Sequence, residues 1–218
     1  MRDPFLKQID AATLKSVRFL GINIIVAFAL FGPVDAYFRT QYPLRDFILL
    51  RIAAVSIVAV LTGLAYTRWA LHPLTMRILG ASIITTACFT VSLLAYMTGG
   101  GSSPYWTMMV LAFFCTTLLI RYSLPEAAII YFIQWLIYNG VMLYGGVDYT
   151  KPEFLNSSVA ILVALIISLV GNWQMRALEF RAFNAQQALA AANEELKKSV
   201  SELAFKKEQA EVKFLQDK

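Results

Sequence analysis

The chain has 218 residues, of which 58% are apolar and only 15% are charged. Soluble domains usually carry about a quarter of charged residues. The charges are also unevenly placed, because residues 176–218 hold 8 of the 19 basic and 7 of the 14 acidic groups. Residues 1–175 therefore carry too few charges to cover a soluble globule. This excludes an ordinary cytosolic enzyme, a secreted disulfide scaffold and a disordered chain.

Residues 1–18 mix charged and apolar residues and form the first predicted region, a short cytoplasmic segment. A cleaved signal peptide would need a short apolar core followed by a cleavage site of small residues. The segment has neither feature, so we do not expect it to be a signal peptide.

Six apolar stretches follow, and each is predicted to cross the membrane, because about 20 mostly apolar residues span about 30 Å of hydrocarbon. They are residues 19–38, 47–67, 77–97, 105–121, 125–144 and 155–175. Ser123, with Glu126 three residues later, has the pattern of a capping box and is predicted to start the fifth span. The predicted fold class is all-α, a polytopic membrane protein whose six-helix domain covers residues 19–175.

Lysine and arginine near the spans predict the orientation, because they accumulate on the cytoplasmic side. With the N-terminus inside, fifteen basic residues lie on the cytoplasmic side and four on the other; without the C-terminal tail the split is seven to four. We therefore expect both termini to be cytoplasmic. The same flanking positions account for the net charge of +5, so nucleic acid is not an expected partner.

Residues 176–218 change to a composition of good helix formers without glycine or proline. Apolar residues recur every seven positions, and the companion positions are often polar. This heptad pattern favours a weak, parallel, two-stranded coiled coil and hence a homodimer. The alternative is a single solvated helix. The predicted dimer seam consists of Leu189, Asn193, Leu196, Val200, Leu203, Lys207 and Ala210.

Motifs of enzymes are absent from the sequence. His72 is the only histidine, which leaves no two-histidine metal site and no phosphoacceptor box, and no phosphate-binding loop is present. We therefore predict no catalytic residue, no metal and no cofactor in this chain.

Polar residues inside the spans are informative, because unsatisfied polarity is expensive in lipid. Asp35 in the first span and Arg51 in the second lie at similar predicted depth and form a candidate intramembrane pair. The alternative is that both side chains extend separately to the outer interface. Asn139 in the fifth span is predicted to hydrogen-bond between helices, with ligand contact as the less favoured alternative.

The loop before the fourth span contains Gly99-Gly100-Gly101 and then Ser103-Pro104, which is typical of a helix start. Tyr105 and Trp106 follow at the predicted outer interface. One interpretation places these rings in an aromatic belt. The other makes the loop a lid and rim over a cavity among the helices.

The order of these features resembles the six-helix module found at the N-terminus of bacterial sensor histidine kinases, including quorum-sensing kinases that detect α-hydroxyketone autoinducers. Similar six-helix modules precede the catalytic domain of some class III nucleotide cyclases. The residues that carry the resemblance are Pro33 with Tyr37-Phe38, Tyr42-Pro43, Leu50-Arg51-Ile52-Ala53-Ala54, Ser103-Pro104-Tyr105-Trp106 and Ala191-Ala192-Asn193-Glu194-Glu195-Leu196-Lys197.

The resemblance implies a receptor in the bacterial inner membrane for a small apolar ligand, held toward the outer half of the helices. In the quorum-sensing branch the pocket lies around the third to sixth spans. The candidate ligand-binding residues are Tyr105, Trp106, Ser103, Asn139, Phe114 and Asn156. The run Gly99–Gly101 departs from those kinases, so the ligand is expected to differ.

The expected function is therefore the sensor module of a histidine kinase, which relays ligand binding through the dimeric helix to a C-terminal catalytic output domain. The principal alternative is the membrane receptor or anchor of a class III adenylate or guanylate cyclase. An anchor that only dimerises would explain the coiled coil equally well, but it would not explain polar residues at the outer ends of the spans. A transporter would need several intramembrane acids, which the sequence lacks.

Overall fold

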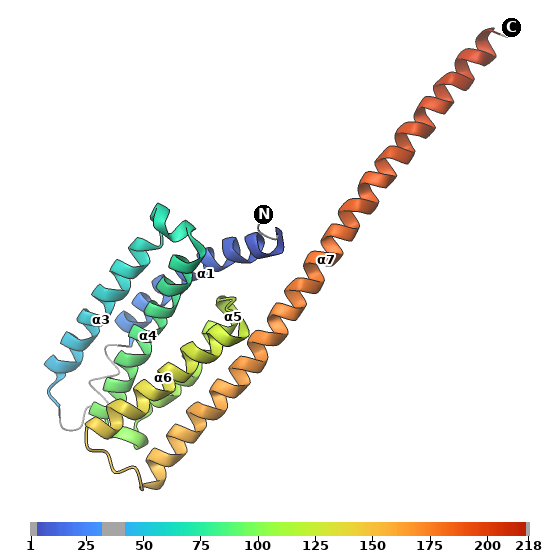
Figure 1. The fold of residues 1–218 in the computed structure, drawn as a ribbon. Coiled ribbons are helices and arrows are strands. Elements are labelled where there is room, and N and C mark those ends of the chain that lie inside the picture. The colour runs from blue at the N-terminus through green and yellow to red at the C-terminus, as the bar shows by residue number, and fades with distance from the viewer. Residues whose placement is uncertain (1–3, 32–41, 217–218) are drawn as a thin grey trace. The chain divides into compact units, whose positions relative to one another are not determined.

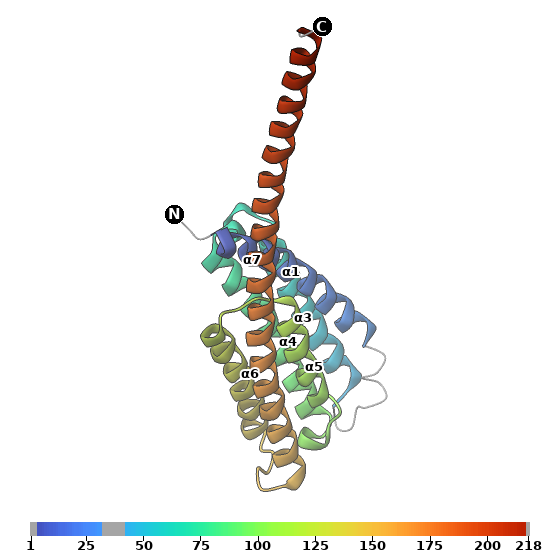
Figure 2. The same cartoon turned by 90° about the vertical axis from the view of Figure 1, so that its right-hand side faces the viewer.

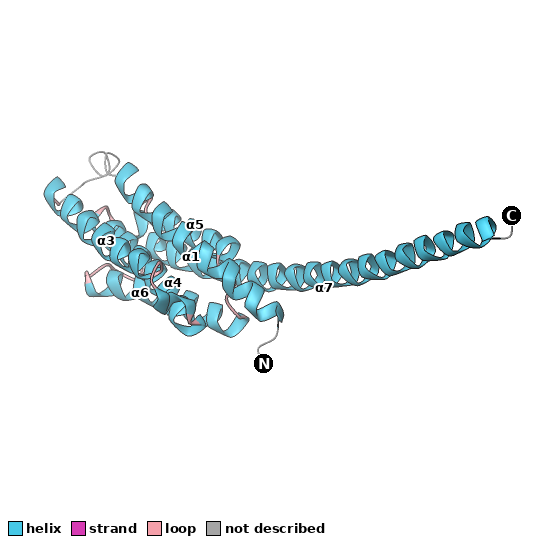
Figure 3. Cartoon of the chain, turned by 90° about the horizontal axis from the view of Figure 1, so that it is seen from above, coloured by secondary structure: helices cyan, strands magenta, loops and turns pink. Residues whose placement is uncertain are grey.

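The structure is a computed structural model and describes residues 4–31 and 42–216. These residues form helices and connecting turns without a strand (Figure 1), which confirms the predicted all-α class. Figure 3 shows the same composition by colour. The elements in chain order are α1 (Pro4–Leu30), α3 (Leu44–Leu64), the 3₁₀ turn η1 (Arg68–Leu71), α4 (Pro73–Met97), the 3₁₀ turn η2 (Gly100–Ser102), α5 (Trp106–Leu119), α6 (Leu124–Tyr144) and α7 (Pro152–Gln216).

The chain divides into two compact units, residues 1–175 and residues 176–218. In the first unit, α4 is the central helix. In its most apolar stretch 61% of residues are buried, against 28% in α1, α3 and α6. The lower burial of the outer helices leaves large aliphatic side chains such as Ile52, Val60 and Ile129 exposed. An apolar surface of this extent belongs in hydrocarbon rather than water, so the chain is a membrane protein.

Five helical segments of the described chain are long and apolar enough to cross a membrane: Gln8–Leu30, Leu44–Leu64, Pro73–Met97, Leu124–Tyr144 and Pro152–Lys207. The predicted fourth span is shorter than expected. Its helix α5 has 14 residues, or about 21 Å, because Pro104 precedes its start and the backbone is extended again at Ile120. Helix length alone therefore supports five spans.

Local sequence explains where α6 begins. The backbone N–H of Ser123 donates to Oε2 of Glu126 at 2.8 Å, and the Ser123 side chain accepts the reciprocal bond, so the predicted capping box is present. Pro125 occupies the first turn, where a missing N–H costs nothing. These features end α5 and begin α6 within five residues, and Figure 2 shows the chain turning back in the connection between the two helices.

The glycine-rich turn joins α4 to α5 and approaches the beginning of α7. Gly99 and Gly100 have positive φ angles of 118° and 63°, which glycine adopts without steric cost. A Cβ on Gly101 would lie 2.5 Å from the backbone nitrogen of Phe154. The run of glycines therefore serves a left-handed turn and a close backbone contact.

The second unit is the part of α7 that follows residue 175. Leu189, Leu196 and Leu203 are 63%, 63% and 66% exposed, and Val200 is also exposed. The side chain of Ala210 lies outside the described residues. Apolar residues at heptad spacing are thus exposed on this part of α7. The predicted coiled coil would cover them, and it remains a prediction.

Replacing Gly101 with alanine is expected to destabilise the bundle by about 1–3 kcal/mol, because the new methyl group must displace the backbone of α7. Gly63→Ala in α3 is the matched control, since a Cβ there has no atom within 4 Å. That control should be neutral or stabilising by about 0.5–1 kcal/mol. Thermal unfolding in detergent measures both. Equal effects of the two substitutions would contradict the close contact.

Candidate functional site

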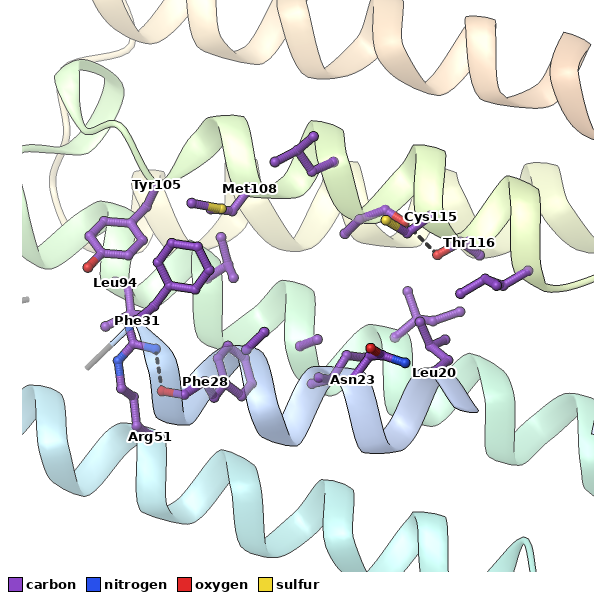
Figure 4. Close-up of a pocket in the computed structure, with 18 of the residues that line it drawn as sticks. Leu20, Asn23, Phe28, Phe31, Arg51, Leu94, Tyr105, Met108, Cys115 and Thr116 are labelled. Carbon is purple, nitrogen blue, oxygen red and sulfur yellow. Dashed lines mark hydrogen bonds between the residues drawn. The ribbon is translucent and has the colours of Figure 1, made fainter. Parts of the chain in front are cut away.

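A cavity of about 340 Å³ lies between α1, α4 and α5, with one side chain contributed by α3. Figure 4 shows it in close-up. This volume is at the lower end of the range for small-molecule sites. We call this cavity the slot. Its lining residues are Phe19, Leu20, Asn23, Ile24, Ala27, Phe28, Phe31, Arg51, Ile84, Ala87, Val91, Leu94, Tyr105, Met108, Leu111, Ala112, Cys115, Thr116 and Leu119.

Arg51 of α3 lies at one end of the slot, near Tyr105 and Phe31 (Figure 4). The residue is only 6% exposed. Its guanidinium donates from Nη1 to the carbonyl oxygen of Phe28 at 3.0 Å and lies 5.8 Å from the centre of the Phe28 ring. Since α1 ends at Leu30, this carbonyl belongs to the last helical turn, where a cation is favoured. Arg51 thereby joins α3 to the C-terminal end of α1.

The opposite end of the slot has neutral polar groups, namely Asn23, Cys115 and Thr116 (Figure 4). The Asn23 amide donates to the carbonyl of Phe19 at 2.7 Å, and the Thr116 hydroxyl donates to the carbonyl of Ala112 at 2.6 Å. These donors are therefore satisfied within their own helices. Between the two ends the wall is aliphatic and aromatic.

Two of the sequence-predicted site residues, Tyr105 and Arg51, line the slot together. Ser103 is buried just outside it. The Ser103 hydroxyl shares a hydrogen bond with Thr98 and accepts the backbone N–H of Tyr105 at 3.2 Å. Ser103 therefore positions Tyr105 at the slot, while the neighbouring glycines contact α7. Asp35 lies outside the described residues, so the predicted pair with Arg51 stays a prediction.

The other candidates lie elsewhere. Trp106 and Phe114 are half-buried on α5 without lining the slot, and Asn156 is exposed on α7. Asn139 donates to the carbonyl of Trp135 at 2.8 Å and accepts the hydroxyl of Ser158 at 2.8 Å. Asn139 thus makes the bond between helices that was favoured for it, linking α6 to α7.

The face of α5 that points away from the slot is bonded to the two helices that follow it. The Thr117 hydroxyl is 2.9 Å from the Tyr131 hydroxyl of α6 and 3.2 Å from the carbonyl of Ser168 on α7. Thr116, its neighbour, lines the slot. Adjacent residues of one short helix therefore contact the slot and α7.

A second link to α7 follows the end of α5. The Asn172 amide donates to the backbone carbonyl of Tyr122 at 3.0 Å, and the Tyr122 hydroxyl donates to the carbonyl of Arg77 at 3.3 Å. Arg77 in turn forms ion pairs with Asp10 of α1, at 3.4 Å, and with Glu126 of α6. This cluster joins α1, α4, α6 and α7 at the end of the bundle opposite Arg51.

Gln134 lies on the buried face of α6, between Tyr131 and Tyr138, and is fully buried. Both polar atoms of its amide lack a hydrogen-bond partner among the described residues. Tyr138, one helical turn away, has a hydrogen-bond partner, since its hydroxyl donates to the Ser157 hydroxyl at 2.8 Å. Gln134 is therefore a buried polar residue of α6 without a hydrogen-bond partner among the described residues, between two tyrosines that each have one.

Comparison with protein-family models, with characterised proteins and with solved structures finds no match for this chain. The resemblance to sensor modules therefore remains a prediction from the residues quoted above. Among the described residues, no group of three or more histidine, cysteine, aspartate or glutamate side chains is placed to hold a metal ion.

The α1 wall of the slot, from Phe19 to Phe31, was missed from the sequence. Its residues are ordinary for a membrane span, and alanines such as Ala27, Ala87 and Ala112 leave the space on three different helices. A cavity that forms where small residues of separate helices meet cannot be recognised from a single sequence, because the sequence does not show which residues face each other.

Replacing Gln134 with leucine is expected to raise the thermal stability of the bundle by about 1 kcal/mol, because it removes a buried amide without a partner. Tyr131→Phe, which deletes the hydroxyl bonded to Thr117, should lower stability by about 0.6 kcal/mol, the usual size of such bonds in membrane bundles. Thermal unfolding in one detergent compares the two. A destabilised Gln134→Leu variant would show that the amide is satisfied in the membrane.

Proposed function

We propose that this chain is the membrane sensor module of a bacterial sensor histidine kinase. A small apolar molecule binds in the slot, and α5 and α7 relay binding to a dimeric helix that controls a catalytic output domain. The observation that carries the proposal is the position of α5, whose residues 116 and 117 contact the slot on one side and α7 on the other.

The relay uses the difference between the two faces of α5. A ligand that favours one position of α5 also changes the distance from the Thr117 hydroxyl to the Ser168 carbonyl, and a ligand shifts an equilibrium by its differential affinity for the two states. Movement of Tyr122 at the end of α5 acts on Asn172 in the same way. Both contacts lie on α7 before residue 175.

Six crossings of the bilayer fit this proposal. Helix α5 covers about 21 Å, and the extended residues 120–123 add about 13 Å. Their sum exceeds the hydrocarbon thickness of about 30 Å. Two of these residues, Ile120 and Tyr122, are buried within the protein and do not face lipid. The Asn172 amide donates a hydrogen bond to the Tyr122 carbonyl, so this backbone group has a partner. With six crossings both termini lie on one side, which the basic residues assign to the cytoplasm.

A second copy of the chain is the proposed partner of the exposed heptad face of α7. Leu189, Leu196 and Leu203 provide the apolar position, and Asn193 and Lys207 interrupt the companion position. Polar residues at such positions favour a defined register and cost stability. A marginal seam is suited to switching, because a small bias changes the population of its states.

Disulfide formation between copies tests the seam and the relay together. In a chain whose Cys88 and Cys115 are alanine, Leu196→Cys and Leu203→Cys are expected to cross-link same-residue pairs in membranes. Lys198→Cys, off the seam, should cross-link at least about fivefold more slowly. A lone or antiparallel helix would give no difference between these positions.

Filling the slot should then change the rate at Leu203→Cys, because α5 and α7 are bonded. Ala112→Phe fills the slot, and Leu118→Phe enlarges an exposed side chain on the same helix without lining it. We expect a change of about threefold for the first and none for the second, as follows from a bias of less than 1 kcal/mol. Equal rates in all three proteins would refute the relay.

The polar seam positions give a further prediction. Asn193→Val with Lys207→Leu should raise the thermal stability of the dimer and hold the seam in one state, because apolar residues at both heptad positions strengthen a coiled coil. In that variant, Ala112→Phe should no longer alter cross-linking at Leu203→Cys. An unchanged response would place the switch elsewhere on α7.

A further inference from the structure

We propose that one end of the bundle binds the headgroup of an anionic phospholipid, whose phosphate is held by Arg18 and Arg68. The site lies between α1 and the connection from α3 to α4, and we call it the basic patch. It consists of Lys15, Arg18, Tyr66, Arg68 and Trp69. None of these residues lines the slot, and the assignment does not depend on the proposed function.

The level of the basic patch in the bilayer carries the first step. Helix α3 has 21 residues and is about 30 Å long, which matches the thickness of the hydrocarbon. The chain leaves this helix at Ala65 and Tyr66, so these residues lie at the polar boundary of the membrane. In Figure 1 the turn from α3 to α4 lies at the same end of the bundle as the N-terminal half of α1. Phospholipid headgroups occupy this level.

Arg18 carries the second step, because its guanidinium is fixed on one side and unbonded on the other. Its Nε donates to the carbonyl oxygen of Ala65 at 2.9 Å, and its guanidinium carbon lies 4.5 Å from the centre of the Tyr66 ring. No carboxylate of the described residues forms an ion pair with Arg18, whereas Arg77 at the same end is paired with two acids. The two terminal nitrogens of Arg18 therefore keep their N–H groups for a ligand, and this planar fork matches the oxygens of a phosphate.

Further cations next to Arg18 carry the third step. Lys15 is exposed one turn earlier on α1, and this spacing places it on the same face of the helix. Arg68 is exposed two residues after Tyr66, the residue whose ring contacts Arg18. Residues 11–18 and 62–76 contain no aspartate or glutamate. The basic patch thus has no local carboxylate to bind the ammonium group of a zwitterionic lipid, and its positive charge favours a headgroup with net negative charge.

Exposed apolar side chains beside these cations carry the fourth step. Trp69, Leu71 and Leu74 are 76%, 68% and 61% exposed. Tryptophan is enriched at the boundary between membrane and water, where its ring packs against lipid. A dissolved anion gains nothing from these side chains, whereas the acyl chains of a lipid pack against them. The occupant that we assign is therefore a phospholipid rather than a soluble phosphate.

Native mass spectrometry of the full chain in detergent tests this assignment. The probe is an equimolar mixture of dioleoyl phosphatidylglycerol and dioleoyl phosphatidylcholine, which have the same chains and differ in headgroup charge. We expect the first bound lipid to be phosphatidylglycerol about tenfold more often, which corresponds to about 1.4 kcal/mol. Higher ionic strength should lower this preference, since salt screens charges that are exposed to water. A large excess of glycerol phosphate should not displace the bound lipid.

Matched variants separate the basic patch from a general response to charge. Arg18→Gln with Arg68→Gln should reduce the preference for phosphatidylglycerol to about twofold or less. Arg45→Gln with Lys151→Gln removes two exposed cations from the other end of the bundle and should leave the preference unchanged. Arg18→Lys should keep part of it, because lysine keeps the charge without the planar fork. Arg68→Gln alone alters an exposed side chain and should lower the preference about threefold, which tests the site even where Arg18→Gln impairs folding.

Three results would overturn the assignment. Equal binding of the two lipids by the unaltered chain would exclude a site for an anionic headgroup. Equal loss of the preference in the two double variants would show a response to total charge, and a preference that neither pair reduces would place the site elsewhere. Displacement of the lipid by glycerol phosphate would make the occupant a soluble anion.

Discussion

Hydrocarbon cannot hydrogen-bond to a polar group, so the backbone polar groups within the spans must find their partners inside the protein. This constraint determines how α5 is held. The helix is too short to cross the bilayer by itself, and the extended residues after it have backbone groups to satisfy. The Asn172 amide of α7 donates a hydrogen bond to the Tyr122 carbonyl. The Thr117 hydroxyl is hydrogen-bonded to the Tyr131 hydroxyl and to the Ser168 carbonyl. The shortest helix is thus bonded directly to α7, and the segment that follows it is bonded to α7 as well.

The same constraint places the slot on the other side of α5. Polar contacts occupy the α6 and α7 side, whereas α1 and α4 meet α5 through apolar and small residues that leave space. Arg51 is a charged exception at the end of that space, and it is accommodated because α1 ends beside it and offers the Phe28 carbonyl. A buried arginine in a membrane helix is costly and marks function by default. Arg51 therefore joins α3 to the end of α1 at one end of the slot.

Sequence reasoning predicted the helices well where the signal is local. The capping box at Ser123 and Glu126 starts α6 as expected. Apolar length predicted six spans, and five helical segments of the described chain are long and apolar enough to cross a membrane. Sequence reasoning overestimated the length of α5, because the apolar composition continues through Ile120, where the backbone is already extended. Of the residues singled out from the sequence, Tyr105, a ligand-site candidate, and Arg51, a member of the candidate pair with Asp35, line the slot. The α1 wall could not be predicted, since which alanines face each other depends on helix rotation that one sequence does not encode.

The buried face of α6 has polar residues that bond to two different helices. Tyr131 is bonded to Thr117 of α5 and Tyr138 to Ser157 of α7, while neither amide atom of Gln134 has a hydrogen-bond partner among the described residues. The two tyrosine bonds hold α5 and α7 against α6, because a displacement would break bonds that hydrocarbon cannot replace. Gln134 makes no such bond, so it adds nothing to that penalty. In the proposed sensor, a ligand in the slot would act on α7 through α5, and it could favour one arrangement only by its differential affinity for the two states.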